Sequence, residues 1–131
     1  MCDSPTGASR ELFRLALRGQ VQLFTSTYAL RETDIHLSDK RVRRAVDAFR
    51  YLSRRSLWTV VDPTREEVVA ALPATPDIAG APIVAAARKA GVDALVTFDR
   101  RRLIRPSVAD YIGAVVATPS QILKQIRAHI N

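Results

Sequence analysis

An acidic residue, Asp99, lies just beyond an apolar run, Ala94–Thr97, that predicts a buried strand. Ligands of parallel sheets bind beyond the carboxyl ends of the strands, so we expect Asp99 at the ligand-binding edge. Carboxylates grouped at such an edge can hold Mg²⁺ or Mn²⁺, which favour oxygen ligands. These metals activate water and stabilise an in-line attack on phosphate. An aspartate at this position can equally cap the next segment, and the position alone leaves both interpretations open.

The loop behind Asp99 is rich in arginine. Its basic residues are Arg100, Arg101, Arg102 and Arg105. Guanidinium groups beside a metal-binding carboxylate would suit a phosphodiester backbone. A basic loop that merely faces solvent has the same composition, so this alternative stays open.

A second carboxylate, Glu32, lies six residues after Ser26, within a helix that we expect over about 27–37. Its side chain could point towards the strand ends, although a helical glutamate more commonly faces water. Asp62 and Asp77 lie in expected loops, where aspartate commonly forms turns.

Several familiar kinds of site are excluded. The sequence has no dinucleotide fingerprint, Walker loop, nucleophile elbow or HExxH motif. Cys2 is the only cysteine, which excludes an intramolecular disulfide and a zinc site of several thiolates. We interpret His36 and His129 as surface or partly packed residues.

Strand-like and helical segments alternate along the chain, which predicts an α/β sandwich with a largely parallel sheet. The expected strands lie at 21–25, 57–61, 94–97 and 114–117. The expected helices lie at 8–18, 27–37, 39–55, 64–72, 81–90 and 119–129. The helix at 39–55 has an arginine-rich face, which we expect to meet solvent rather than nucleic acid.

The composition fits one packed domain over residues 1–131, because 47% of the residues are hydrophobic and domains of this length are common. No apolar run approaches the roughly 20 residues of a membrane helix, and the N-terminus does not resemble a signal peptide. We therefore expect a cytoplasmic protein. The net charge of +7 suggests a polyanionic partner such as nucleic acid, although many solvated surfaces are also basic.

Three stretches, taken in order, resemble the PIN-domain family over nearly the whole chain. They are Ser4–Phe13 followed by Leu23-Phe24-Thr25-Ser26-x5-Glu32, then Ala81–Ala87 followed by Gly91–Arg101, then Ala117-Thr118-Pro119-Ser120-x-x-Leu123. In the second stretch, Thr97-Phe98-Asp99 resembles the T-x-D motif of the family. The third stretch resembles the strand and helix that end the family's domain.

The resemblance implies a PIN-like three-layer α/β sandwich with a mostly parallel central sheet, and Mg²⁺- or Mn²⁺-dependent cleavage of RNA. Many bacterial members are VapC-like toxins that an antitoxin protein holds inactive, and dimers are common. By position, Glu32 and Asp99 match metal-binding acids of the family. Ser26 and Thr97 match the small hydroxyl residues that support the site.

The sequence departs from the family in two places. The family begins with a central strand ending in an aspartate, which is missing here because the sequence starts three residues before Ser4. Asp3 comes too late to replace that acid. Gly80 stands where the family usually has another aspartate, and Asp77 is the candidate substitute. Without the central strand, we expect the strands at 21–25 and 94–97 either to close on each other or to accept another chain, which favours a homo-oligomer.

Two functions remain as hypotheses. The first is a toxin-like, metal-dependent ribonuclease in which Glu32 and Asp99 hold the metal, Asp77 assists and the arginine-rich loop contacts RNA. The second is a catalytically degenerate PIN-fold module that binds RNA, an antitoxin-like partner or its own copy without hydrolysis. The missing acids favour the second, because each lost carboxylate weakens metal binding. The resemblance favours the first. A chain shortened at its start is a further explanation, although it does not account for Gly80.

Overall fold

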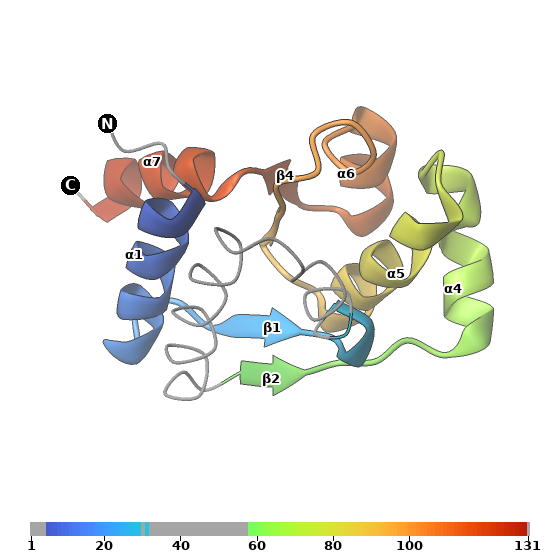
Figure 1. Cartoon of the computed structure of the whole chain (residues 1–131), viewed down its shortest axis with the longest axis horizontal. Helices are drawn as coiled ribbons and strands as arrows, with labels where there is room; N and C mark the ends of the chain where they lie inside the picture. Colours follow the sequence, from blue (N-terminus) through green and yellow to red (C-terminus); the bar gives the residue numbers. More distant parts are fainter. Residues whose placement is uncertain (1–4, 30, 32–57, 131) are drawn as a thin grey trace, which may run out of the picture.

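The computed structural model describes residues 5–29, 31 and 58–130 (Figure 1). The helices are α1 (Pro5–Leu17), α4 (Arg65–Ala71), α5 (Ala81–Ala90), α6 (Pro106–Ile112) and α7 (Pro119–Ile130). The strands are β1 (Leu23–Thr25), β2 (Trp58–Val60), β3 (Ala94–Val96) and β4 (Val115–Ala117). Two short 3₁₀ turns, η1 (Leu72–Ala74) and η2 (Ile78–Gly80), join α4 to α5. Residues 27–29 and 31 are also helical.

Every strand pair in the described residues is parallel, as the alternation predicts. β1 pairs with β2, and β3 pairs with β4. These pairs form two two-stranded sheets, where the sequence predicts one central sheet. Of the two outcomes expected beside a missing central strand, closure of β1 on β3 through a ladder is not found in this part of the chain.

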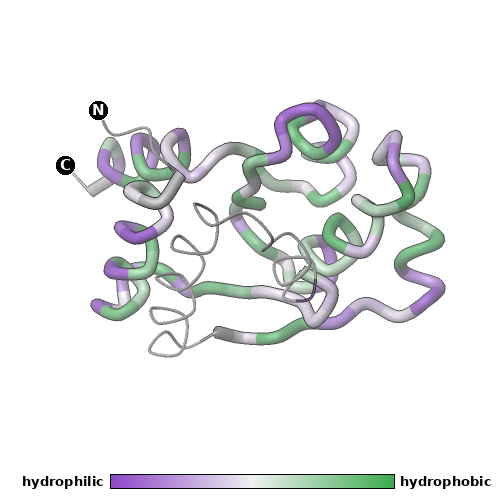
Figure 2. Tube along the Cα trace, in the orientation of Figure 1, coloured by the Kyte–Doolittle hydropathy of each residue, from purple (hydrophilic) through white to green (hydrophobic). Residues whose placement is uncertain are grey.

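Two hydrophobic clusters hold the elements together. Around α5, small buried residues let α4 and α6 pack closely, with Val84 and Val108 fully buried. In the second cluster α1 packs against α7, and Leu12 and Leu123 are both buried there. Hydrophilic and hydrophobic stretches alternate along the tube of both helices in Figure 2, as expected of amphipathic helices.

Several helix ends follow the predicted signals. Thr64 and Glu67 form the reciprocal capping box of α4. Gly91 ends α5 in the left-handed conformation, with φ of 66°. Helix α6 was not predicted, because the loop after Asp99 was expected to continue to the last strand. Its signals are Pro106 in the first turn and Gly113 just past the end, but its seven residues are too few to show a helical period.

Some predictions fall on other parts of the chain. Glu32, His36 and the expected helix at 39–55 lie outside the described residues, as do Cys2 and Asp3. Among the described helices, none combines the length and the apolar character that crossing a membrane requires.

Candidate metal and phosphate site

Asp99 lies in the turn that follows β3, beyond the carboxyl end of the strand. The Thr97 hydroxyl accepts a hydrogen bond from the Asp99 amide at 3.0 Å, which fixes the start of the turn. The Asp99 Oδ1 atom accepts from the Arg102 amide at 3.0 Å. Asp99 therefore lies at the predicted edge position and caps the following turn. Its role as a metal ligand stays a prediction. Thr97 precedes Asp99 by two residues in the same turn.

Asp77 comes from the connection between η1 and η2, 22 residues earlier in the chain. Its Oδ1 atom accepts from the Ala79 amide at 3.0 Å and so caps η2. The expected turn-forming role of Asp77 is thus seen. Only one of its two carboxylate oxygens serves the cap, which leaves Oδ2 to face other groups.

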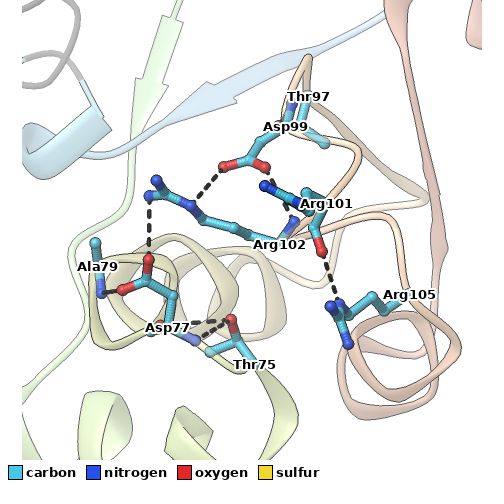
Figure 3. Close-up of polar contacts among 8 residues, drawn as sticks. All are labelled: Thr75, Asp77, Ala79, Thr97, Asp99, Arg101, Arg102 and Arg105. Carbon is cyan, nitrogen blue, oxygen red and sulfur yellow. Dashed lines mark hydrogen bonds and ion pairs between the residues drawn. The ribbon is translucent and has the colours of Figure 1, made fainter.

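Arg102 joins these two carboxylates. Its NH1 atom lies 3.2 Å from Asp77 Oδ2, and its Nε atom lies 3.6 Å from Asp99 Oδ2. Figure 3 shows the guanidinium between the two acids. Half of the Arg102 side chain is exposed, and each carboxylate is more than one third exposed. Two carboxylates from separate elements therefore contact one guanidinium at the surface.

The other loop arginines are placed differently. Arg105 donates from Nε to the carbonyl of Arg101 at 2.7 Å, which helps to shape the loop (Figure 3). Arg100 and Arg101 are exposed. Of the four predicted phosphate-binding arginines, only Arg102 forms an ion pair within the described part of the chain.

Gly80 is buried at the start of α5. A Cβ atom built on it would lie 2.9 Å from Thr75 Oγ1 and 3.2 Å from Leu103 Cδ2. Position 80 is therefore closed by its neighbours, and an aspartate there would force Thr75 to move.

Ser26 lies at the carboxyl end of β1, in the other sheet. It is 2% exposed, and its hydroxyl accepts from the Ala29 amide at 3.1 Å. It therefore caps the helical residues that follow β1. The structure brings together Asp77, Asp99, Thr97 and Arg102, and it leaves Ser26 on a separate sheet.

A second polar cluster was not predicted as a unit. Asp62 follows β2 and accepts from the Thr27 amide at 2.8 Å and from its hydroxyl at 2.7 Å. The hydrogen bonds from the Thr27 side chain and backbone lower the pKa of Asp62. Lys89 donates to the Asp62 carbonyl at 3.1 Å and to Glu67 Oε1 at 3.0 Å. The cluster ties the ends of β1 and β2 to α4 and α5, and an aspartate directly after a strand was its only signal.

A separate hollow of about 340 Å³ lies over α4, α5 and α6. It is lined by Glu67, Ala70, Ala85, Arg88, Lys89 and Tyr111. The Arg88 guanidinium stacks 4.3 Å above the Tyr111 ring and donates to the Tyr111 carbonyl at 2.8 Å. These contacts hold α5 against α6, and neither acid of the candidate site lines the hollow.

The described carboxylates of the site are too few to form a complete metal-ligand set. Among the described residues, no three His, Cys, Asp or Glu side chains gather as a metal-ligand set. Asp77 and Asp99 both contact the Arg102 guanidinium. Mg²⁺ is commonly held by one or two carboxylates together with substrate phosphates and water, so the pair fits this kind of ion. Glu32, the further predicted ligand, lies outside the described residues.

The described strands pair in parallel, and an acidic turn follows β3. A family model described as PIN domain matches residues 1–101, which is 101 of the 131 residues. The chain therefore belongs to the PIN-domain family. The matched range includes Asp77, Gly80 and Asp99. Neither the curated proteins nor the solved structures gave a match.

Proposed function

We propose that this chain is a PIN-domain ribonuclease that cleaves RNA with Mg²⁺ or Mn²⁺. The observation that carries the proposal is that Asp77 and Asp99, from two separate elements, both contact the Arg102 guanidinium. In a protein of a nuclease-like family, such a pair supports metal-dependent phosphodiester hydrolysis. Glu32 remains a predicted third ligand.

The residues would divide the work by position. Asp77 and Asp99 would hold the metal through oxygen atoms, each carboxylate being oriented by one backbone amide. Thr97 would keep the Asp99 turn in place. When bound, the metal would activate water and stabilise charge on the phosphate. The predicted phosphate contacts are Arg100, Arg101, Arg102 and Arg105, whose charges would attract the RNA backbone.

The proposal is tested by cleavage of a labelled single-stranded RNA with and without Mn²⁺. We expect cleavage only with the metal, and a loss of roughly 100-fold or more in Asp99→Asn, since even supporting residues of metal sites cost 10–100-fold. Asp110→Asn, on the exposed side of α6, is the matched control and should cleave normally. Metal-dependent cleavage that Asp99→Asn retains would contradict the proposed site.

The biological setting that we propose is a toxin–antitoxin pair in the cytoplasm, with the chain as the toxin. This part rests on the family resemblance in the sequence. Induced expression in a bacterial host should arrest growth, and expression of Asp99→Asn should not. We also propose that residues 1–131 act as one PIN-like domain that associates with its own copy, which light scattering in solution would test.

A second candidate is a PIN-fold module that binds RNA or a protein without hydrolysis. The observation that favours it is the closed position at Gly80, where Thr75 and Leu103 fill the space of an acidic side chain. Metal-independent RNA binding without cleavage would support this candidate over the ribonuclease.

A further inference from the structure

We propose that the Arg102 guanidinium occupies the Asp77–Asp99 pair and blocks binding of a divalent metal. An RNA phosphate would bind the guanidinium instead and so free the two carboxylates. Metal and RNA would then load the site together. The inference rests on the proposed ribonuclease function and adds a way to regulate the same site.

The two oxygens of each carboxylate have different partners. The Oδ1 atoms of Asp77 and Asp99 each accept one backbone N–H, from Ala79 and Arg102 respectively. The two Oδ2 atoms face the same guanidinium, at 3.2 Å and 3.6 Å (Figure 3). A metal shared by the pair would bind through these Oδ2 atoms. It would therefore compete directly with Arg102.

Arg102 and a divalent cation carry charge of the same sign. A guanidinium and a divalent cation between the same two carboxylates repel each other strongly, since both are positive and only a few ångströms apart. Either Arg102 or the metal can hold the pair, but not both. The closed arrangement satisfies the acids without metal.

The contact of Arg102 with the two acids is exposed and can open readily. The Arg102 side chain is 51% exposed, and exposed ion pairs contribute little to stability. Arginine also binds phosphate through two parallel hydrogen bonds, which is a geometry that fits it well. An RNA phosphate at the site can therefore bind Arg102 and separate it from the two acids with little loss of stability.

The neighbouring arginines do not share this arrangement. Arg105 is tied by its Nε atom to the Arg101 carbonyl. Arg100 is exposed and makes no ion pair with either of these two described carboxylates. The closing contact is thus specific to Arg102. Arg100 offers a control of equal charge on the same loop.

The experiment measures Mn²⁺ affinity by calorimetry, first without nucleic acid. Arg102→Gln removes both ion pairs and should bind Mn²⁺ about 3- to 30-fold more tightly than the unchanged chain, the range expected for two exposed pairs. Arg100→Gln removes the same charge and should change the affinity by less than about threefold. Arg102→Lys, which keeps the charge but cannot span both acids, should lie between the two.

The titration is then repeated with a short 2′-O-methyl RNA that resists cleavage. Binding of two ligands that favour the same open state is reciprocal, so the oligonucleotide should tighten Mn²⁺ binding to the unchanged chain. It should do so much less in Arg102→Gln, where the pair is already open.

Equal Mn²⁺ affinity in the unchanged chain and Arg102→Gln would overturn the inference, as would an equal gain in Arg100→Gln. Absence of Mn²⁺ binding to every variant at millimolar concentrations would overturn it as well. RNA cleavage separates this failure from that of the proposed function. Cleavage with unchanged affinities refutes only the closing role of Arg102, whereas the expected affinities without cleavage refute only the ribonuclease.

Discussion

The closed position at Gly80 gives the sharpest prediction about packing. The backbone there has φ of −80° and ψ of −22°, which alanine adopts easily. Without crowding, Gly80→Ala would stabilise the protein by about 0.4–1 kcal/mol, because the unfolded chain loses freedom. The new methyl group instead lies 2.9 Å from Thr75 Oγ1 and 3.2 Å from Leu103 Cδ2. Overpacking of this kind costs about 1–3 kcal/mol, so we expect a net loss of about 1 kcal/mol.

A double-mutant cycle isolates the crowding. Thr75→Ala removes the nearest atom at the cost of two weak hydrogen bonds of 3.4 Å. In that background, Gly80→Ala should become neutral or stabilising, which gives a coupling of about 1 kcal/mol or more. The assay is urea unfolding of the four proteins, followed by circular dichroism.

Gly91→Ala serves as the control for the cycle. Gly91 has open space around it but a φ of +66°, so alanine should cost about 1 kcal/mol whether or not Thr75 is present. Gly80→Ala that is as stable as the unchanged chain would refute the packing argument. It would also reopen position 80 to an acidic side chain.

Asp62, Thr97 and Val84 each allow a test by a single substitution. Asp62 has a lowered folded-state pKa, so its stabilising contribution is present above the ordinary aspartate value of 3.8 and is lost as pH falls through the lower folded value. Between pH 7 and pH 3, the free energy of unfolding measured with urea should therefore fall less in Asp62→Asn than in the unchanged chain. An equal fall in both proteins would contradict the Thr27 contact. Thr97→Val removes the acceptor of the Asp99 amide and should lower Mn²⁺ affinity. The free energy of unfolding should fall by only about 1 kcal/mol, since one hydrogen bond is lost. Normal Mn²⁺ affinity by calorimetry would contradict a supporting role of Thr97. Val84→Ala should cost about 2 kcal/mol by thermal or urea unfolding, because Val84 is fully buried, and a loss below about 0.5 kcal/mol would contradict the packing around α5.

The sequence predicted those parts of the fold that depend on local signals. The capping box of Thr64 and Glu67 and the terminating Gly91 both act within one helix turn, so their effect is visible in the residues themselves. The run before Asp99 likewise predicted a strand and an edge position. The short helix α6 escaped because seven residues carry too little periodicity.

The contacts that define the candidate site depend on long-range packing. Asp99 and Arg102 are three residues apart in one turn, so their contact is local. Asp77 meets Arg102 only because η2 and the turn after β3 come together in space. Thr27 and Asp62 are 35 residues apart, and the closed space at Gly80 depends on Leu103, 23 residues away. No spacing in the sequence encodes these long-range contacts. The sequence therefore predicted candidate residues, whereas the pairing of Arg102 with Asp77 required the fold.

Mn²⁺ binding by the unchanged chain, Asp77→Asn and Asp99→Asn tests most directly whether Asp77 and Asp99 together hold a divalent cation. We expect one site in the unchanged chain and an affinity roughly 10-fold or more weaker in each variant, because each removes one of the two carboxylates. Affinities that are equal in all three proteins would contradict it.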